Sequence, residues 1–104
     1  MNSYRYRVTV EKLSDAQGEP VHGQCLSFYA SNQDDILAIV SQLQGKLPFD
    51  AGTAASLGVG LKLFSEIALI RRNDPMFDSI RPALVEFIQQ LKKFSTETVS
   101  LKSS

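Results

Sequence analysis

Apolar and polar residues alternate one by one near the start of the chain. Tyr4, Tyr6, Val8 and Val10 take the even positions, and charged or polar residues take positions 5, 7, 9 and 11. A period of two among aromatic and β-branched residues predicts a half-buried strand. A second β-rich run covers about 21–30, and turn-forming residues fill the segment between. The pattern therefore predicts an antiparallel hairpin with a long loop.

The spacing of apolar residues changes to that of a helix after position 32. Asn32 is the expected N-cap, and Asp34 and Asp35 suit the positive end of the helix dipole. Gly45 marks the expected end. The apolar stripe between these signals consists of Ile36, Leu37, Ile39, Val40 and Leu43.

Residues 54–72 allow two interpretations. Apolar residues at helical spacing predict a largely buried helix, with Asp50 or Thr53 as its cap. Gly58 and Gly60 disfavour a helix, and the alternation over 59–63 also suits a strand. The length of the segment favours the helix. In that case the glycines would permit the close approach of another backbone.

A third helix is predicted from Ser79 as N-cap to about Phe94, with Pro82 in its first turn. Residues 95–104 are expected to form a polar, flexible tail, with a short strand at 98–101 as the alternative. The order is β-β-α-α-α, which predicts an α+β fold. We expect one globular domain over residues 1–94.

Composition narrows the possible compartments and partners. The 104 residues include eleven basic and eleven acidic side chains, so no net charge draws the chain toward nucleic acid or anionic membranes. A single cysteine suits a reducing compartment. We see neither a signal-peptide pattern nor an apolar stretch near the length of a membrane span, and we expect a soluble cytoplasmic protein that does not contact membranes.

Three segments carry a resemblance to a known family. They are Tyr-Arg-Tyr-Arg-Val-Thr-Val-Glu at 4–11, Asp-Asp-Ile-Leu-Ala-Ile-Val at 34–40 and Leu-Gly-Val-Gly-Leu-Lys-Leu-Phe at 57–64. Together they resemble a family of small uncharacterised bacterial proteins, a domain of unknown function. The resemblance implies a bacterial cytoplasmic origin and supports a helix over 54–72. It implies no activity and no functional residue.

Catalytic and metal-binding motifs are not found in the sequence. The only histidine and the only cysteine, His22 and Cys25, lie three residues apart in a predicted strand and should therefore point to opposite faces. Gly58-Val59-Gly60 begins a dinucleotide-binding pattern, but Leu63 occupies the place of its third glycine. We therefore predict no catalytic residue, no cofactor and no metal.

A few basic residues remain as candidate contacts for a ligand. Arg5, Arg7, His22 and Arg71 would be the polar contacts of a small molecule held in a pocket between hairpin and helices. Nucleic acid binding through Arg5 and Arg7, aided by Lys92 and Lys93, is disfavoured because the nearby aromatic residues are expected to face away from the arginines.

The hypothesis that fits these observations best is an interaction or oligomerisation protein without catalytic activity. It would associate with itself as a homodimer or with another protein. The unpaired edges of the hairpin and the apolar residues over 54–68 are the expected contact surfaces. The small-molecule-binding protein and the weak nucleic-acid binder remain the alternatives.

Overall fold

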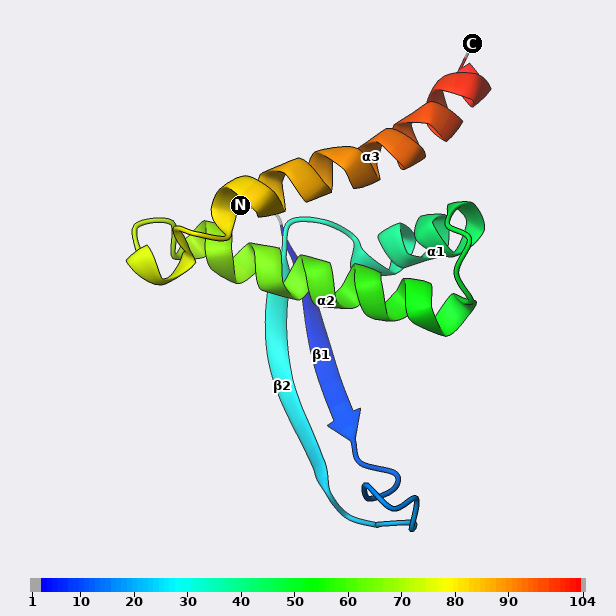
Figure 1. The fold of residues 1–104 in the computed structure, drawn as a ribbon, viewed down its shortest axis with the longest axis vertical. Helices are drawn as coiled ribbons and strands as arrows, with labels where there is room; N and C mark the ends of the chain where they lie inside the picture. The colour runs from blue at the N-terminus through cyan, green and yellow to red at the C-terminus, as the bar shows by residue number, and fades with distance from the viewer. Residues whose placement is uncertain (1–2, 104) are drawn as a thin grey trace. The chain divides into compact units, whose positions relative to one another are not determined.

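The computed structural model describes residues 3–103, with the surroundings of side chains described as far as residue 93. Contacts group the chain into two compact units, Met1–Asp34 and Asp35–Ser104. The elements, shown in Figure 1, are β1 (Tyr4–Glu11), β2 (Cys25–Asn32), α1 (Ile36–Lys46), α2 (Ala51–Ile70), a short 3-10 helix (Pro75–Phe77) and α3 (Arg81–Ser103). The predicted α+β class and the order β-β-α-α-α are confirmed. The single domain over 1–94 stays a prediction.

The first unit is a two-stranded antiparallel sheet made of β1 and β2 (Figure 1). Tyr4 lies opposite Asn32 at one end, and Glu11 lies opposite Cys25 at the other. In this register even-numbered residues of β1 face even-numbered residues of β2. Because opposing residues of an antiparallel pair share a face, one face is mainly apolar and the other mainly polar.

The loop between the strands is longer than the sequence suggested. β2 begins at Cys25 and not near Val21, because Gly18 and Gly23 take positive φ angles of 84° and 78° that interrupt an extended backbone. Asp15 closes the loop: its Oδ1 accepts hydrogen bonds from the N–H groups of Gln17 and Glu19, each at 2.9 Å. The extended backbone of β2 then continues to Asn32, past the expected end at Ala30.

The junction after β2 corrects the predicted helix cap. Asn32 is buried, and its Oδ1 accepts a hydrogen bond from the N–H of Asp34 at 3.0 Å. The N-cap of α1 is Asp35, whose Oδ1 accepts from the N–H of Ala38 at 3.2 Å. Asn32 thus stabilises the turn before the helix, and a hydrogen bond from the Tyr6 hydroxyl to the Asp34 carbonyl, 3.0 Å long, ties that turn to β1.

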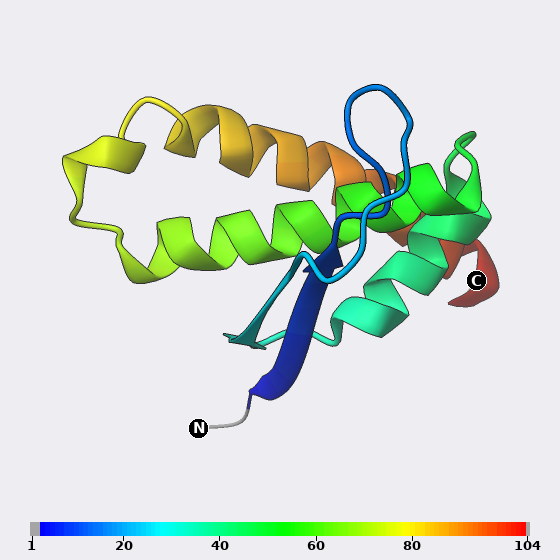
Figure 2. The same cartoon turned by 90° about the horizontal axis from the view of Figure 1, so that it is seen from below.

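In the second unit, α1 and α2 pack side by side (Figures 1 and 2). Gly45 does not end α1, which continues to Lys46 and closes with a hydrogen bond from Leu47 N–H to the Leu43 carbonyl at 2.9 Å. A β-carbon on Gly58 of α2 would lie 3.7 Å from the Cα atom of Val40 in α1, so the predicted close approach of another backbone is found at Gly58, whereas a β-carbon on Gly60 would meet nothing within 4 Å. The buried apolar residues of the described chain are Ile36, Leu43, Ala54 and Ala68.

The helical interpretation of residues 58–64 is confirmed, since all of them lie within α2. The helix begins at Ala51, before the expected position 54, because Asp50 is its N-cap. The Asp50 carboxylate accepts hydrogen bonds from the hydroxyl of Thr53 at 2.6 Å and from its N–H at 3.1 Å. These bonds lower the pKa of Asp50 from its ordinary value.

The last helix is longer than predicted. α3 begins at Arg81 with Pro82 in its first turn, and it continues to Ser103, past the expected end near Phe94. The predicted helix end near Phe94 and the alternative strand at 98–101 are therefore wrong, whereas the flexibility of residues 95–104 stays a prediction. Neither glycine nor proline follows Pro82. Since adding a residue to an existing helix costs far less than starting one, the polar Ser and Thr residues did not end it.

Candidate interaction surface on the hairpin

The polar face of the hairpin holds a cluster of two arginines around one tyrosine. Arg7 lies opposite Tyr29, and its Nη2 donates a hydrogen bond to the Tyr29 hydroxyl at 3.3 Å. The Cζ atoms of Arg5 and Arg7 lie 5.0 and 5.6 Å from the centre of the Tyr29 ring. These are cation–π distances, so one exposed ring holds two guanidinium groups in place.

This cluster corrects the expectation that aromatic residues face away from the arginines. Tyr6, between Arg5 and Arg7 on β1, does point to the other face, but Tyr29 reaches the polar face from β2. The register between strands decides this, and a pattern within one strand carries no information about it. Next along the same face, the hydroxyls of Thr9 and Ser27 share a hydrogen bond of 2.8 Å.

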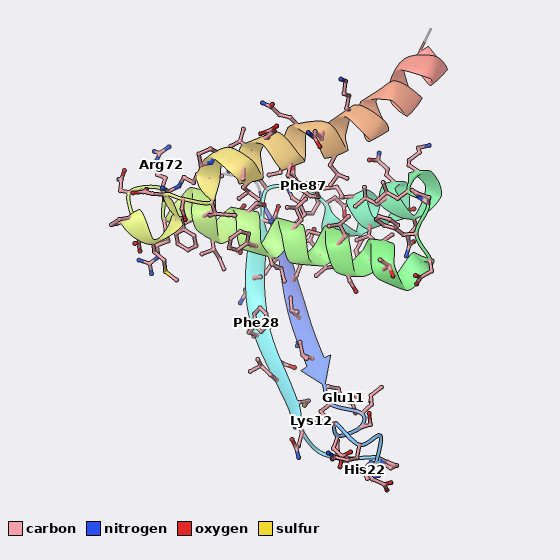
Figure 3. The ribbon with its side chains drawn as sticks, in the orientation of Figure 1. Glu11, Lys12, His22, Phe28, Arg72 and Phe87 are labelled. Atoms are coloured by element: carbon pink, nitrogen blue, oxygen red, sulfur yellow. The ribbon has the colours of Figure 1, made fainter. Side chains whose placement is uncertain are left out.

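The apolar face of the hairpin is open over much of its length. Val10 and Leu26 lie opposite each other, and they are 59% and 61% exposed. Phe28, labelled in Figure 3, lies opposite Val8 and is also exposed. The two tyrosines of β1 stack with their ring centres 6.5 Å apart. We call the side chains of this surface the apolar face: Tyr4, Tyr6, Val8, Val10, Leu26, Phe28 and Ala30.

His22 and Cys25 do not share a strand, contrary to prediction. His22 lies in the loop, beyond the end of β1 near Lys12 (Figure 3), whereas Cys25 is the first residue of β2. Both are exposed. The alternation of faces along a strand therefore does not describe their relation. Within the described part of the chain, no group of three or more His, Cys, Asp or Glu side chains is placed to hold a metal ion.

The four candidate ligand contacts are thus distributed over three places. Arg5 and Arg7 come together around Tyr29, and His22 lies at the opposite end of the hairpin. Arg71 belongs to the other unit, where it is the C-cap of α2. Their role in binding a ligand, and the pocket expected to unite them, stay predictions.

Sequence reasoning missed Arg81, which has more polar contacts than any of these four. Its Nη2 donates to the carbonyls of Arg71 at 2.6 Å and Asp74 at 3.2 Å, and its Nη1 pairs with Asp78 at 2.7 Å. The guanidinium also lies over the ring of Phe77, 5.9 Å from its centre. The spacing Asp78–Arg81, one helical turn, is the signal that could have revealed the ion pair. These contacts of Arg81 therefore stabilise the segment that connects α2 and α3.

α2 presents a second apolar surface and corrects one expectation. Over Ala51–Ile70 its mean hydropathy is 1.4, and by length and composition alone this helix could cross a membrane. This contradicts the expectation that the sequence holds no apolar stretch near the length of a membrane span. The apolar stretch is hard to recognise in the sequence because Gly, Ala and Ser residues separate its large apolar side chains without adding charge. Only 17% of this apolar stretch is buried, and the side chains of Ile67, Leu69 and Ile70 are more than half exposed.

Comparison with known proteins agrees with the resemblance seen in the sequence. The profile of one family, DUF3861, a domain of unknown function with a solved structure, matches residues 4–93. This chain belongs to that family. A crystal structure of a protein of unknown function from the bacterium Pectobacterium atrosepticum is similar at 29% identity, with a TM-score of 0.76. The similarity covers 88% of this chain and 99% of that one. Among curated proteins no match is found.

Membership of the DUF3861 family does not assign an activity to this chain. Both the family and the similar structure are described as of unknown function. No catalytic function is indicated by either comparison. The function must therefore be inferred from the surfaces that the structure presents.

Proposed function

We propose that this chain is a small interaction protein of the bacterial cytoplasm that associates with itself and has no catalytic activity. The open apolar face of the hairpin carries this proposal. Val10 and Leu26, directly opposite each other, remain more than half exposed on a sheet of two strands. A hairpin of this size is marginally stable in water unless its apolar face packs against something and its edges are covered.

The exposed side of α2 supports the same function. Phe64, Ile67 and Ile70 are exposed on this helix. Burying such apolar side chains is favourable by roughly 25 cal/mol per Å² of apolar area removed from water. Because residues three apart are neighbours on a helix surface, these side chains lie along one stripe of α2, and interaction surfaces commonly contain exposed apolar patches. Association of two copies would bury such residues without a second type of chain.

The molar mass in solution tests this function. Light scattering over a wide range of concentration should give twice the chain mass of 11.5 kDa at the upper end. The melting temperature should also rise with protein concentration, because mass action stabilises a folded dimer. A mass of 11.5 kDa at every concentration, with a constant melting temperature, would contradict self-association.

A second candidate function is favoured by the cluster of Arg5, Arg7 and Tyr29. Two guanidinium groups beside an aromatic ring suit the phosphates and bases of single-stranded nucleic acid. Fluorescence anisotropy of a labelled single-stranded oligonucleotide tests it. Binding should weaken steeply with salt and should fall when Arg7 is replaced by Ala, but not when the exposed Arg72 is replaced. If the anisotropy stays unchanged at low salt, this function is excluded.

A further inference from the structure

One edge of β1 is unpaired in the part of the chain that the structure describes, because the sheet contains β1 and β2 alone. The direction of its hydrogen-bonding groups follows from the ladder. Lys12 N–H donates to the Gln24 carbonyl at 2.9 Å, in continuation of the strand register. Since bonded pairs alternate along an antiparallel ladder, even-numbered residues bond to β2. The backbone groups of Arg5, Arg7, Thr9 and Glu11 therefore point to the open edge.

We propose that a second copy of this chain pairs along this edge, antiparallel to β1, with Val8 opposite Val8 of the second copy. This inference deepens the proposed self-association and rests on it. In this register Arg5 of each copy lies opposite Glu11 of the other, and Arg7 lies opposite Thr9. Two oppositely charged pairs form, and the two sheets become one sheet of four strands with a continuous apolar face.

Charge complementarity identifies this partner as a second copy. Within the described residues, neither Arg5 nor Glu11 forms an ion pair in its own chain: Arg5 lies opposite Ser31, and Glu11 lies opposite Cys25. Both side chains are exposed on the same face. Opposite charges facing each other across strands stabilise a sheet, and each chain brings one of each sign. The strand is thus complementary to itself when reversed.

Neighbouring registers are less favourable. Because a strand repeats every two residues, a shift by one would place apolar side chains opposite polar ones. A shift by two in one direction places Arg7 directly against Arg7 of the second copy, which is repulsive. A shift by two in the other direction pairs Arg7 with Glu11 but leaves Arg5 beyond the end of the opposing strand. Among the registers that place apolar residues opposite apolar ones, the one centred on Val8 has the longest overlap with no like charges opposed.

Exchange of the two charges tests the register. Arg5→Glu and Glu11→Arg should each weaken self-association by about tenfold, because two attractive pairs become two repulsive ones. Mixing the two variants should restore association, since every pair in the mixed dimer is again opposite in sign. Native mass spectrometry, which separates the two chains by mass, should show a mixed dimer well above the statistical share. The double variant should associate like the original chain.

A matched control carries the same charge changes elsewhere. Arg72→Glu and Glu86→Arg alter exposed side chains of the second unit, and their mixture should remain statistical. Suppose that the original chain forms dimers. If Arg5→Glu then associates equally well, or if Arg5→Glu and Glu11→Arg form only the statistical share of mixed dimer, the β1 register is wrong, although self-association is still supported. If the original chain is monomeric throughout, both proposals are wrong.

Cysteine cross-linking gives an independent measurement in a Cys25→Ser background. Val8 would face its counterpart as a non-hydrogen-bonded pair with Cα atoms about 4.5 Å apart, within disulfide reach. Val10 lies on the same face, but its counterpart would be four residues further along the strand, about 13 Å away. Under mild oxidation Val8→Cys should give a disulfide-linked dimer and Val10→Cys should not. Equal or faster cross-linking at the more exposed position 10 would overturn the register.

Discussion

Gly58 of α2 lies so close to Val40 of α1 that a β-carbon at position 58 would stand 3.0 Å from the Val40 Cγ2 atom. The same β-carbon would lie 3.2 Å from Cδ1 of Leu43, which is buried. A valine in a helix has one strongly preferred rotamer and cannot easily turn away. The contact between α1 and α2 therefore depends on a residue without a side chain. Gly60, two positions later, meets nothing within 4 Å.

The two glycines should respond in opposite ways to the same substitution. Gly60→Ala should raise the free energy of unfolding by about 0.5–1 kcal/mol, because alanine favours the helix. Gly58→Ala should lower it by about 1 kcal/mol, since overpacking outweighs that gain. Urea denaturation measures both values. If Gly58→Ala is as stable as Gly60→Ala, the close contact is not a constraint.

A double-mutant cycle shows whether Val40 is the residue responsible. Val40→Ala removes the Cγ2 atom that the new β-carbon would meet. We expect Gly58→Ala to be tolerated better in the Val40→Ala background than in the original chain, with a coupling of at least about 0.5 kcal/mol. A coupling near zero would place the strain at Leu43.

Arg81 should contribute to stability far more than Arg72. Replacement of Arg81 by Lys removes the planar fork that reaches the Arg71 and Asp74 carbonyls and the Asp78 carboxylate together. We expect a loss of about 2 kcal/mol and faster amide exchange over 74–78. Arg72→Lys is the control, because Arg72 is exposed. Equal stability of the two variants would show that the Arg81 contacts contribute little.

Asp50 should make the stability of the second unit depend on pH in acid. Its pKa in the folded chain is lowered, first by the Thr53 hydroxyl and then by the Thr53 N–H. A lowered pKa stabilises the fold above the ordinary value of 3.8, and this contribution is lost as the pH falls through the folded pKa. Asp50→Asn should therefore melt at a lower temperature than the original chain at neutral pH, with the difference shrinking in acid.

Thermal melts followed by circular dichroism over the acidic range give this comparison. Glu86→Gln removes a negative charge from an exposed position of α3 and is the control. A difference between Asp50→Asn and the original chain that is independent of pH would contradict the assigned role of the Asp50 charge.

The apolar helix α2 should not carry the chain into membranes. Lys62 and Glu66 lie one turn apart within it, and a lysine at the centre of a bilayer costs about 2.5–3.5 kcal/mol on insertion scales. In a flotation experiment with phosphatidylcholine vesicles, the original chain should stay in the aqueous fraction. The double variant Lys62→Leu, Glu66→Leu should shift toward the vesicles. Flotation of the original chain would contradict an aqueous location.

The sequence by itself determined β1, α1 and α3, whereas for residues 54–72 it left helix and strand both open. Alternation over 4–11 and helical spacing over 36–43 and 80–91 were sufficient, because the period of side chains along one segment is a local property of its backbone. Some of the predicted boundaries were wrong. Gly45 lies inside α1, and α3 continues past Phe94, since a helix ends where propagation becomes unfavourable and not at every polar residue.

Tertiary structure decided everything that depends on two segments meeting. The register of the hairpin brought the Tyr29 ring to Arg5 and Arg7, and the packing of α1 on α2 left little room for a β-carbon at Gly58 but ample room at Gly60. Likewise, Arg81 reaches the carbonyl of Arg71 only because the chain turns back between α2 and α3. Contacts of this kind join residues far apart in the sequence, so no pattern within one segment determines them.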